Sequence, residues 1–228
     1  MKNYCVSLSK FIEAKGNKNI AQAQSKYMRF KFPFYGIMQK PLSEAIKEFY
    51  EIHGKVEIEN TMSFVQECFS YHYRELWHVG LGILRKNVKK LPDTHLEDFK
   101  KIIIKGDWWD VTDSMASGVV GDYLQKYPHL LPEMDAWIQH ENYWIRRTAI
   151  IYQLKYRKDL DTQRLFKYIL LCAHEKEFFI RKAIGWSLRE YSKTNARAVI
   201  EFIETHDTVL SGLSKREGMK WILANDKL

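Results

Sequence analysis

An internal repeat of about 34 residues is the feature that most constrains how this chain can fold. The segment Arg147–Leu154 recurs as Arg181–Leu188 and again as Arg216–Leu223, with a small residue third, an aromatic sixth and a leucine eighth. One period before Arg147 lies Asp113. Periods of this length with helical spacing are typical of solenoids, in which each helix pair buries its faces against neighbouring pairs. We therefore expect an all-α superhelical solenoid of antiparallel helix pairs.

The composition agrees with long helices in a single body. The chain has 228 residues, 46% of them hydrophobic, with only 5 prolines and 11 glycines to interrupt helices. No Gly/Ser-rich or low-complexity stretch divides it. The sequence therefore predicts one continuous domain over residues 1–228, with a split into two domains as the alternative.

The cysteines and the hydropathy exclude several classes of protein. Cys5, Cys68 and Cys172 are far apart, odd in number and in no metal-ligand spacing, so we expect neither a disulfide framework nor a metal site. No cofactor-binding motif is visible. No segment approaches the roughly 20 apolar residues that a membrane-spanning helix needs. We expect a cytoplasmic protein that is neither exported nor inserted in a membrane.

The charge indicates the kind of partner. A net charge of +8 and a pI near 9.2 favour polyanions, chiefly nucleic acid or anionic lipid. No polybasic tail points to a membrane surface. Nucleic acid is therefore a candidate partner, and the alternative is a basic enzyme that binds no nucleic acid.

The repeat register places four charged residues in one column. Equivalent positions of successive units lie side by side on a solenoid, so Asp113, Arg147, Arg181 and Arg216 should line up. Guanidinium groups bind phosphate bidentately and stay charged, so three aligned arginines can follow a DNA backbone. The alternative is that they form salt bridges between repeats or line a solvated edge.

The octapeptide Gly106–Asp113 combines two adjacent tryptophans with three carboxylates. A helix starting at Asp107 would put Trp109 and Asp113 one turn apart on a shared face. This pair has little use in a core, which makes it a candidate site. The alternative is a surface aspartate beside a half-buried tryptophan.

Several longer segments carry a family resemblance. They are Asp107–Ser114, Asn142–Arg147, Glu177–Asn195 and Leu213–Glu217, with Lys26–Met28 and Phe34–Ile37 near the start. In this order and spacing they resemble the DNA alkylation repair glycosylases of the AlkD type, which are built on HEAT-like repeats. The resemblance implies cleavage of the N-glycosidic bond of cationic N3- and N7-alkylpurines in duplex DNA. It also implies that the lesion is not flipped into a base pocket.

The resemblance also implies roles for individual residues. Asp113, Trp109 and Trp186 fall on the family's catalytic positions, and Arg147 on the position that holds the adjacent phosphate. The other expected DNA-binding residues are Arg181, Arg216, Tyr27, Lys40, Lys182 and Lys215. We expect a monomer acting on alkylated duplex DNA without a cofactor or metal. For Trp186 the alternative is a purely structural role, because Tyr152 and Trp221 share its repeat position.

One segment departs from the family pattern. After Gly36–Ile37 the proline is displaced by one residue, to Pro41, and Ser43 and Glu44 stand where the family has basic residues. A carboxylate there would oppose phosphate binding. The alternative function is therefore a divergent paralogue with weak DNA binding and little or no excision, because residues 38–47 are altered. A HEAT-type protein-interaction module is a third, less favoured interpretation.

Overall fold

The computed structural model describes residues 1–225, and all their regular structure is helical. The chain divides into two compact units, Met1–Pro92 and Asp93–Leu228, called unit 1 and unit 2 below. The prediction of one continuous domain stays a prediction, and each unit is described by itself. The all-α prediction is confirmed for the described residues, none of which forms a strand.

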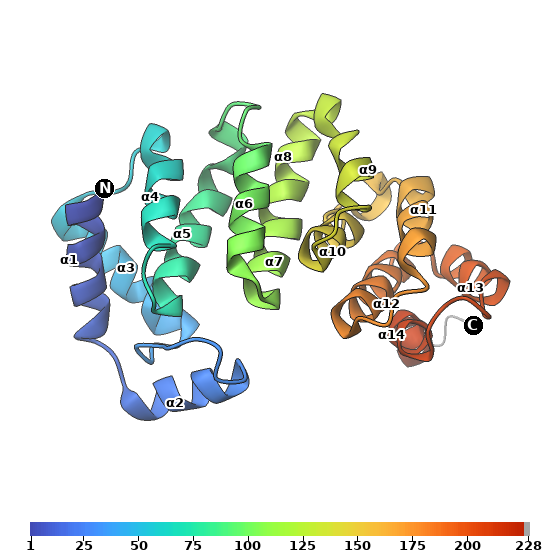
Figure 1. Ribbon diagram of the computed structural model, residues 1–228, viewed down its shortest axis with the longest axis horizontal. Helices are drawn as coiled ribbons and strands as arrows, with labels where there is room; N and C mark the ends of the chain where they lie inside the picture. Colours follow the sequence, from blue (N-terminus) through green and yellow to red (C-terminus); the bar gives the residue numbers. More distant parts are fainter. Residues whose placement is uncertain (226–228) are drawn as a thin grey trace. The chain divides into compact units, whose positions relative to one another are not determined.

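Unit 1 consists of five helices and two short 3-10 turns (Figure 1). The helices are α1 (Lys2–Glu13), α2 (Lys18–Tyr27), α3 (Gln39–His53), α4 (Thr61–Cys68) and α5 (Arg74–Asn87). The turns are Ile58–Asn60 and Val88–Lys90. Helix α1 packs on α3 and α4, and α4 packs on α5. Leu8, Phe49, Phe64 and Leu76 are fully buried between them and form the centre of this core.

A buried carboxylate holds the connection between α2 and α3. Glu75, at the start of α5, is 1% exposed and accepts hydrogen bonds from the backbone amides of Tyr35, Gly36 and Ile37 at 3.0, 2.9 and 3.4 Å. Gly36 has φ +93°, a conformation that favours glycine. Since a buried charge needs hydrogen bonds or a counter-charge, these amides are what make Glu75 tolerable in the core.

Unit 2 contains the repeats (Figure 1). Its helices are α6 (Leu96–Gly106), α7 (Trp109–Met115), α8 (Gly121–Lys126), α9 (Glu133–Trp137), α10 (Tyr143–Ile151), α11 (Thr162–Cys172), α12 (Phe178–Ser192), α13 (Ala196–Thr205) and α14 (Gly212–Ala224). Pro128–Leu130 and Arg157–Asp159 are 3-10 turns, and Ala116–Val120 is a π-helical turn between α7 and α8.

The helices of unit 2 alternate between two layers. Helices α7, α10, α12 and α14 pack on one another in that order, while α6, α9, α11 and α13 each pack on a member of this row. Several of these helices begin at an N-cap residue whose side chain accepts a hydrogen bond from a backbone amide of the first turn. The acceptors and donors are Asn142 and Trp144 N, Asp161 and Arg164 N, and Asn195 and Ala198 N. The repeat period of the sequence is thus the spacing between successive helix pairs.

The small residues of the repeat lie where helices approach closely. Ala149 and Ala183 are buried. A Cβ added to Gly218 would lie 3.1 Å from Cβ of Leu188 on α12, and one added to Gly185 would lie 2.4 Å from Cβ of Glu217 on α14. A side chain at Gly185 would therefore force α12 and α14 apart.

Further expectations concern cysteines, metals and membranes. Cys5, Cys68 and Cys172 are buried free thiols. Across residues 1–225, no cluster of three or more histidine, cysteine or carboxylate side chains could hold a metal ion. No helix in the same residues has the length and apolar character of a membrane span.

Candidate functional site

The candidate site begins at the turn between α6 and α7. Helix α6 ends at Gly106, Asp107 adopts the left-handed conformation with φ +40°, and Trp108 is the N-cap of α7. The predicted helix start at Asp107 is therefore wrong. Asp107 instead accepts a hydrogen bond from Nε1 of Trp144 at 3.0 Å, so its carboxylate joins α7 to α10 rather than capping a helix.

Trp109 and Asp113 both belong to α7, four residues apart, and both are partly exposed. Side chains at this spacing lie on one face of a helix. The neighbouring Trp108 is 5% exposed and makes edge contacts with Trp144 and Phe179. The two adjacent tryptophans therefore have different surroundings, Trp108 in the core and Trp109 at the surface.

Asp113 and Arg147 form a bidentate ion pair across one repeat. Arg147 Nε donates to Asp113 Oδ1 at 2.8 Å, and Nη2 donates to Oδ2 at 2.9 Å. The side chains are 5% exposed for Arg147 and 19% exposed for Asp113. The third guanidinium nitrogen, Nη1, donates to the carbonyl of Phe179 at the start of α12. One arginine thus joins α7, α10 and α12.

The environment of Asp113 affects its protonation. Burial raises the pKa of the Asp113 carboxyl above its ordinary value, with a smaller contribution from Asp110, while Arg147 opposes the rise. The Asp113 side chain nevertheless keeps 19% of its surface exposed. Asp113 is thus a partly desolvated carboxylate with one fixed cationic partner.

Shortly after Asp113 the backbone hydrogen bonding changes from α-helical to π-helical. The π-helical turn Ala116–Val120 directly follows α7, and Ser117 Oγ donates to the carbonyl of Asp113 at 3.4 Å. Single π turns are rare and are found mostly near functional sites. The sequence does not predict this feature, because hydrophobic periodicity does not distinguish a single π turn from α-helix.

The predicted phosphate contact of Arg147 is not favoured by its position. Its guanidinium is nearly inaccessible, and all three of its nitrogens donate within the protein. Of the two alternatives for the arginine column, the salt bridge between repeats describes Arg147. It is the partner of Asp113 in the structure.

The other predicted DNA-binding cations of unit 2 have varied surroundings. Arg181 Nε donates to the carbonyl of Glu175 at 2.8 Å, and Arg216 on α14 is exposed. Lys182 Nζ lies 3.1 Å from Glu217, and Lys215 Nζ lies 2.6 Å from Asp207. The repeat register therefore predicts which helix face these residues occupy but not their side-chain partners.

Trp186 differs from Tyr152, one of the two other aromatics at its repeat position. It is partly exposed on α12, whereas Tyr152 on α10 is 1% exposed. Lys182, Trp186 and Arg189 are spaced along one face of α12, and both cations pair with Glu217, which is 5% exposed. Sequence analysis missed Glu217 as the residue that fixes the charged groups flanking Trp186.

Tyr27 and Lys40 belong to unit 1. Tyr27 is the last residue of α2 and is 73% exposed, and Lys40 lies exposed in the first turn of α3. The altered segment also lies on α3, with Ser43 and Glu44 exposed and Ser43 Oγ donating to the carbonyl of Gln39 at 2.9 Å. Despite its displaced Pro41, the segment is helical.

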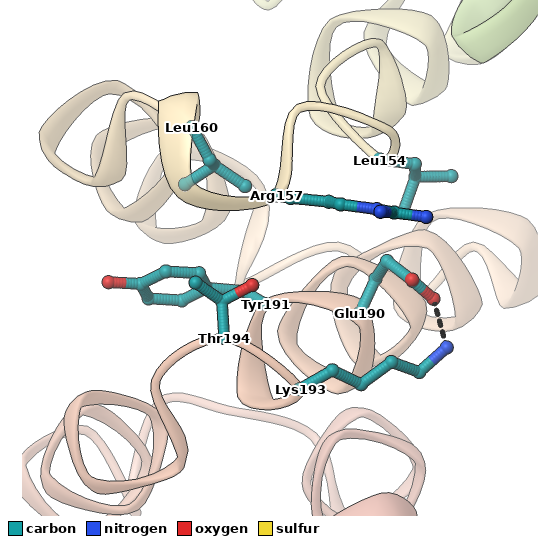
Figure 2. A pocket seen from close by; sticks show the side chains of 7 residues that line it. All are labelled: Leu154, Arg157, Leu160, Glu190, Tyr191, Lys193 and Thr194. Carbon is teal, nitrogen blue, oxygen red and sulfur yellow. Dashed lines mark hydrogen bonds and ion pairs between the residues drawn. The ribbon is translucent and has the colours of Figure 1, made fainter.

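The predicted catalytic residues do not coincide with a pronounced cavity of unit 2. Figure 2 shows a cavity of about 350 Å³ at the C-terminal ends of α10 and α12, lined by Leu154, Arg157, Tyr191 and their neighbours. Lys193 Nζ lies 2.7 Å from Glu190 on its wall. Trp109, Asp113, Arg147 and Trp186 do not line it.

Two comparisons with known proteins bear on the fold and the family of the chain. The family model described as "DNA alkylation repair enzyme" matches residues 8–222. A solved structure titled "Predicted DNA alkylation repair enzyme from Enterococcus faecalis" is 30% identical, with a TM-score of 0.80 over 90% of this chain and 96% of that one. Among curated proteins, none is similar enough to count as a match. The described helices, their repeat register and these two similarities lead to one conclusion: the chain belongs to the family of DNA alkylation repair enzymes.

Proposed function

We propose that the protein is a DNA glycosylase that hydrolyses the N-glycosidic bond of cationic N3- and N7-alkylpurines in duplex DNA. The observation that carries the proposal is the partly exposed Asp113 carboxylate, bound bidentately by buried Arg147, with partly exposed Trp109 and Trp186. In this proposal the protein acts as a cytoplasmic monomer without a cofactor.

The chemistry follows from the charge of the substrate. An alkylated purine already carries a positive charge, so it leaves as a neutral base when the C1′–N bond breaks and takes the electron pair. Positive charge then develops on the deoxyribose, and Asp113 stabilises it. Water adds to C1′ and loses a proton, which gives the abasic sugar. The carboxylate also orients that water, as in glycoside hydrolysis.

The two tryptophans act on the same charge. The electron-rich faces of Trp109 and Trp186 attract a cationic sugar, and such contacts stabilise by about 1–2 kcal/mol when desolvated. Both side chains are partly exposed, as this role requires. The site does not require a base pocket, since these groups act on the sugar.

Arg147 acts through Asp113. Its two donated hydrogen bonds favour the ionised carboxylate and fix the orientation of both oxygens. Contact with DNA phosphates then falls to the other predicted DNA-binding residues, Tyr27, Lys40, Arg181, Lys182, Lys215 and Arg216.

The test is release of methylated purines from alkylated duplex DNA by the purified protein in excess. We expect release of 7-methylguanine and 3-methyladenine in the parent protein and loss of release in Asp113→Asn. No release from DNA that another glycosylase processes would overturn the proposal.

The position of Ser43 and Glu44 supports a second candidate function. Both side chains are exposed on α3, where a carboxylate would repel phosphates. A paralogue of this kind would bind alkylated and undamaged duplexes equally and weakly, with little or no excision. The base-release assay separates the two functions.

A further inference from the structure

An exposed aromatic ring lies on a rigid turn after α2. Phe30 is 70% exposed, and both Arg29 and Phe30 have left-handed backbone conformations, with φ +56° and +58°. Such conformations are uncommon outside glycine, asparagine and aspartate because the Cβ atom crowds the backbone. The chain therefore holds this turn against a local preference.

The turn is a C-terminal capping motif of α2 whose apolar residue, Phe30, is largely exposed. Arg29 N donates to Lys26 O at 3.0 Å, and Phe30 N donates to Ser25 O at 2.7 Å, the two hydrogen bonds of a Schellman cap. In that motif the apolar residue at the Phe30 position usually packs back on the helix. Here Phe30 itself adopts the left-handed conformation, and its ring is largely exposed to solvent.

Further contacts fix the turn. Ser25 Oγ donates to the carbonyl of Phe32 at 3.0 Å, Lys31 N donates to Met28 O at 3.2 Å, and Met28 is 4% exposed. A ring presented by a fixed backbone loses little conformational entropy on binding. The geometry thus suits a contact made by the ring itself.

The charge around the turn identifies the partner. Between Glu13 and Glu44 the sequence has no acidic residue but contains Lys15, Lys18, Lys26, Arg29, Lys31 and Lys40. Lys26, Arg29 and Lys31 lie within four residues of Phe30, and all three are exposed. A flat apolar ring among cations matches the chemistry of a nucleobase between phosphates, since the ring can stack on the base and the cations can bind the phosphates.

We propose that Phe30 inserts at a deformed base step of duplex DNA and stacks on a base, while Lys26 and Arg29 bind the flanking phosphates. This inference rests on the proposed binding of duplex DNA but not on base excision. Insertion of apolar side chains at base steps is a common way of kinking DNA. The ring would favour steps that a damaged or mismatched base has already weakened.

The experiment uses the full chain and a short duplex with 2-aminopurine beside a mismatch. Phe30→Asn is the main variant, because asparagine tolerates the left-handed conformation and so keeps the turn while removing the ring. Ile52→Asn is the matched control, since Ile52 is an exposed apolar residue of unit 1, 64% exposed, outside the basic stretch. Melting temperatures establish that both variants are folded.

We expect Phe30→Asn to weaken duplex binding about 5- to 100-fold, the range for loss of one stacked base, without changing the salt dependence of binding. The parent protein should raise 2-aminopurine fluorescence, and Phe30→Asn should not. Ile52→Asn should match the parent in both measurements.

Parent-like affinity and fluorescence in Phe30→Asn would overturn the inference. Dependence on Phe30 for single strands but not for duplexes would also overturn it. Failure of base release with a Phe30-dependent fluorescence change would leave this inference standing and refute the proposed glycosylase.

Discussion

The cations of the two units have different surroundings. In unit 1 the stretch between Glu13 and Glu44 contains no carboxylate, and its Lys26, Arg29 and Lys40 are exposed, although Lys15 pairs with Glu48 of α3. In unit 2 two cations of the candidate site are joined to carboxylates of other repeats, Arg147 to Asp113 and Lys182 to Glu217. An ion pair fixes the positions of both of its side chains, whereas an exposed cation can attract a negatively charged partner. Unit 1 is therefore suited to affinity for a polyanion and unit 2 to positioning.

The sharpest test of this contrast is Asp113→Asn. Because positive charge on the sugar grows only in the transition state, the variant should lower single-turnover excision by about 10²-fold or more. Duplex affinity should change little, since Asp113 binds no phosphate. Single-turnover kinetics and anisotropy on the same duplex measure the two effects, and an unchanged rate would remove Asp113 from the mechanism.

The pH dependence of excision should report the protonation of Asp113. Burial raises the pKa of Asp113, and the ionised form is the active one, so the rate should fall as the pH is lowered through this raised pKa. The acid limb should therefore lie above the ordinary range for aspartate. Rates measured at saturating protein exclude an effect on binding. A rate that stays constant down to the ordinary aspartate range would contradict the predicted ionisation.

Charge removal should separate the two units by salt dependence. Substituting Lys26 and Arg29 together by glutamine should flatten the slope of log affinity against log salt by about one to two units. Replacing Lys182 and Lys215 in the same way should flatten it less, because each already lies beside a carboxylate. If the slope of log affinity against log salt were the same in the two double variants, the proposed difference between the cations of the two units would be refuted.

The smallest effect should come from α3. Replacing Ser43 and Glu44 by arginine should raise duplex affinity by about 1 kcal/mol or less per exposed charge. The same replacements should leave the single-turnover rate at saturation unchanged if the enzyme is already active. A large gain in that rate would instead favour the non-excising paralogue.

The sequence predicted the repeat helices better than the contacts between their side chains. Ala149, Ala183 and Gly218 follow the period because helices approach closely there, so the register could be derived from residue size. It also placed Asp113 one repeat from Arg147. The period could not decide whether an arginine faces phosphate or a neighbouring carboxylate, since both options share the same backbone position.

The boundaries and exposures within one repeat were harder to predict. A helix start at Asp107 was expected because aspartate is a good N-cap, but Asp107 adopts the left-handed conformation and binds Trp144 instead. Tyr152 and Trp186 share a repeat position, yet only Tyr152 is in the core. Such differences depend on which neighbouring helix covers each aromatic ring, and that information is not local in the sequence.

The hydrogen bonds of Glu75 also bear on the order in which unit 1 folds. Its partners at residues 35–37 are separated from it by about 40 positions of chain, whereas α1, α2 and α3 can each form from local contacts. Closing a long loop costs entropy before any contact compensates for it. The link between α2 and α3 should therefore become ordered only once α5 docks. Its amide protons should become protected from hydrogen exchange late in folding, together with those of α5 rather than those of the adjoining helices.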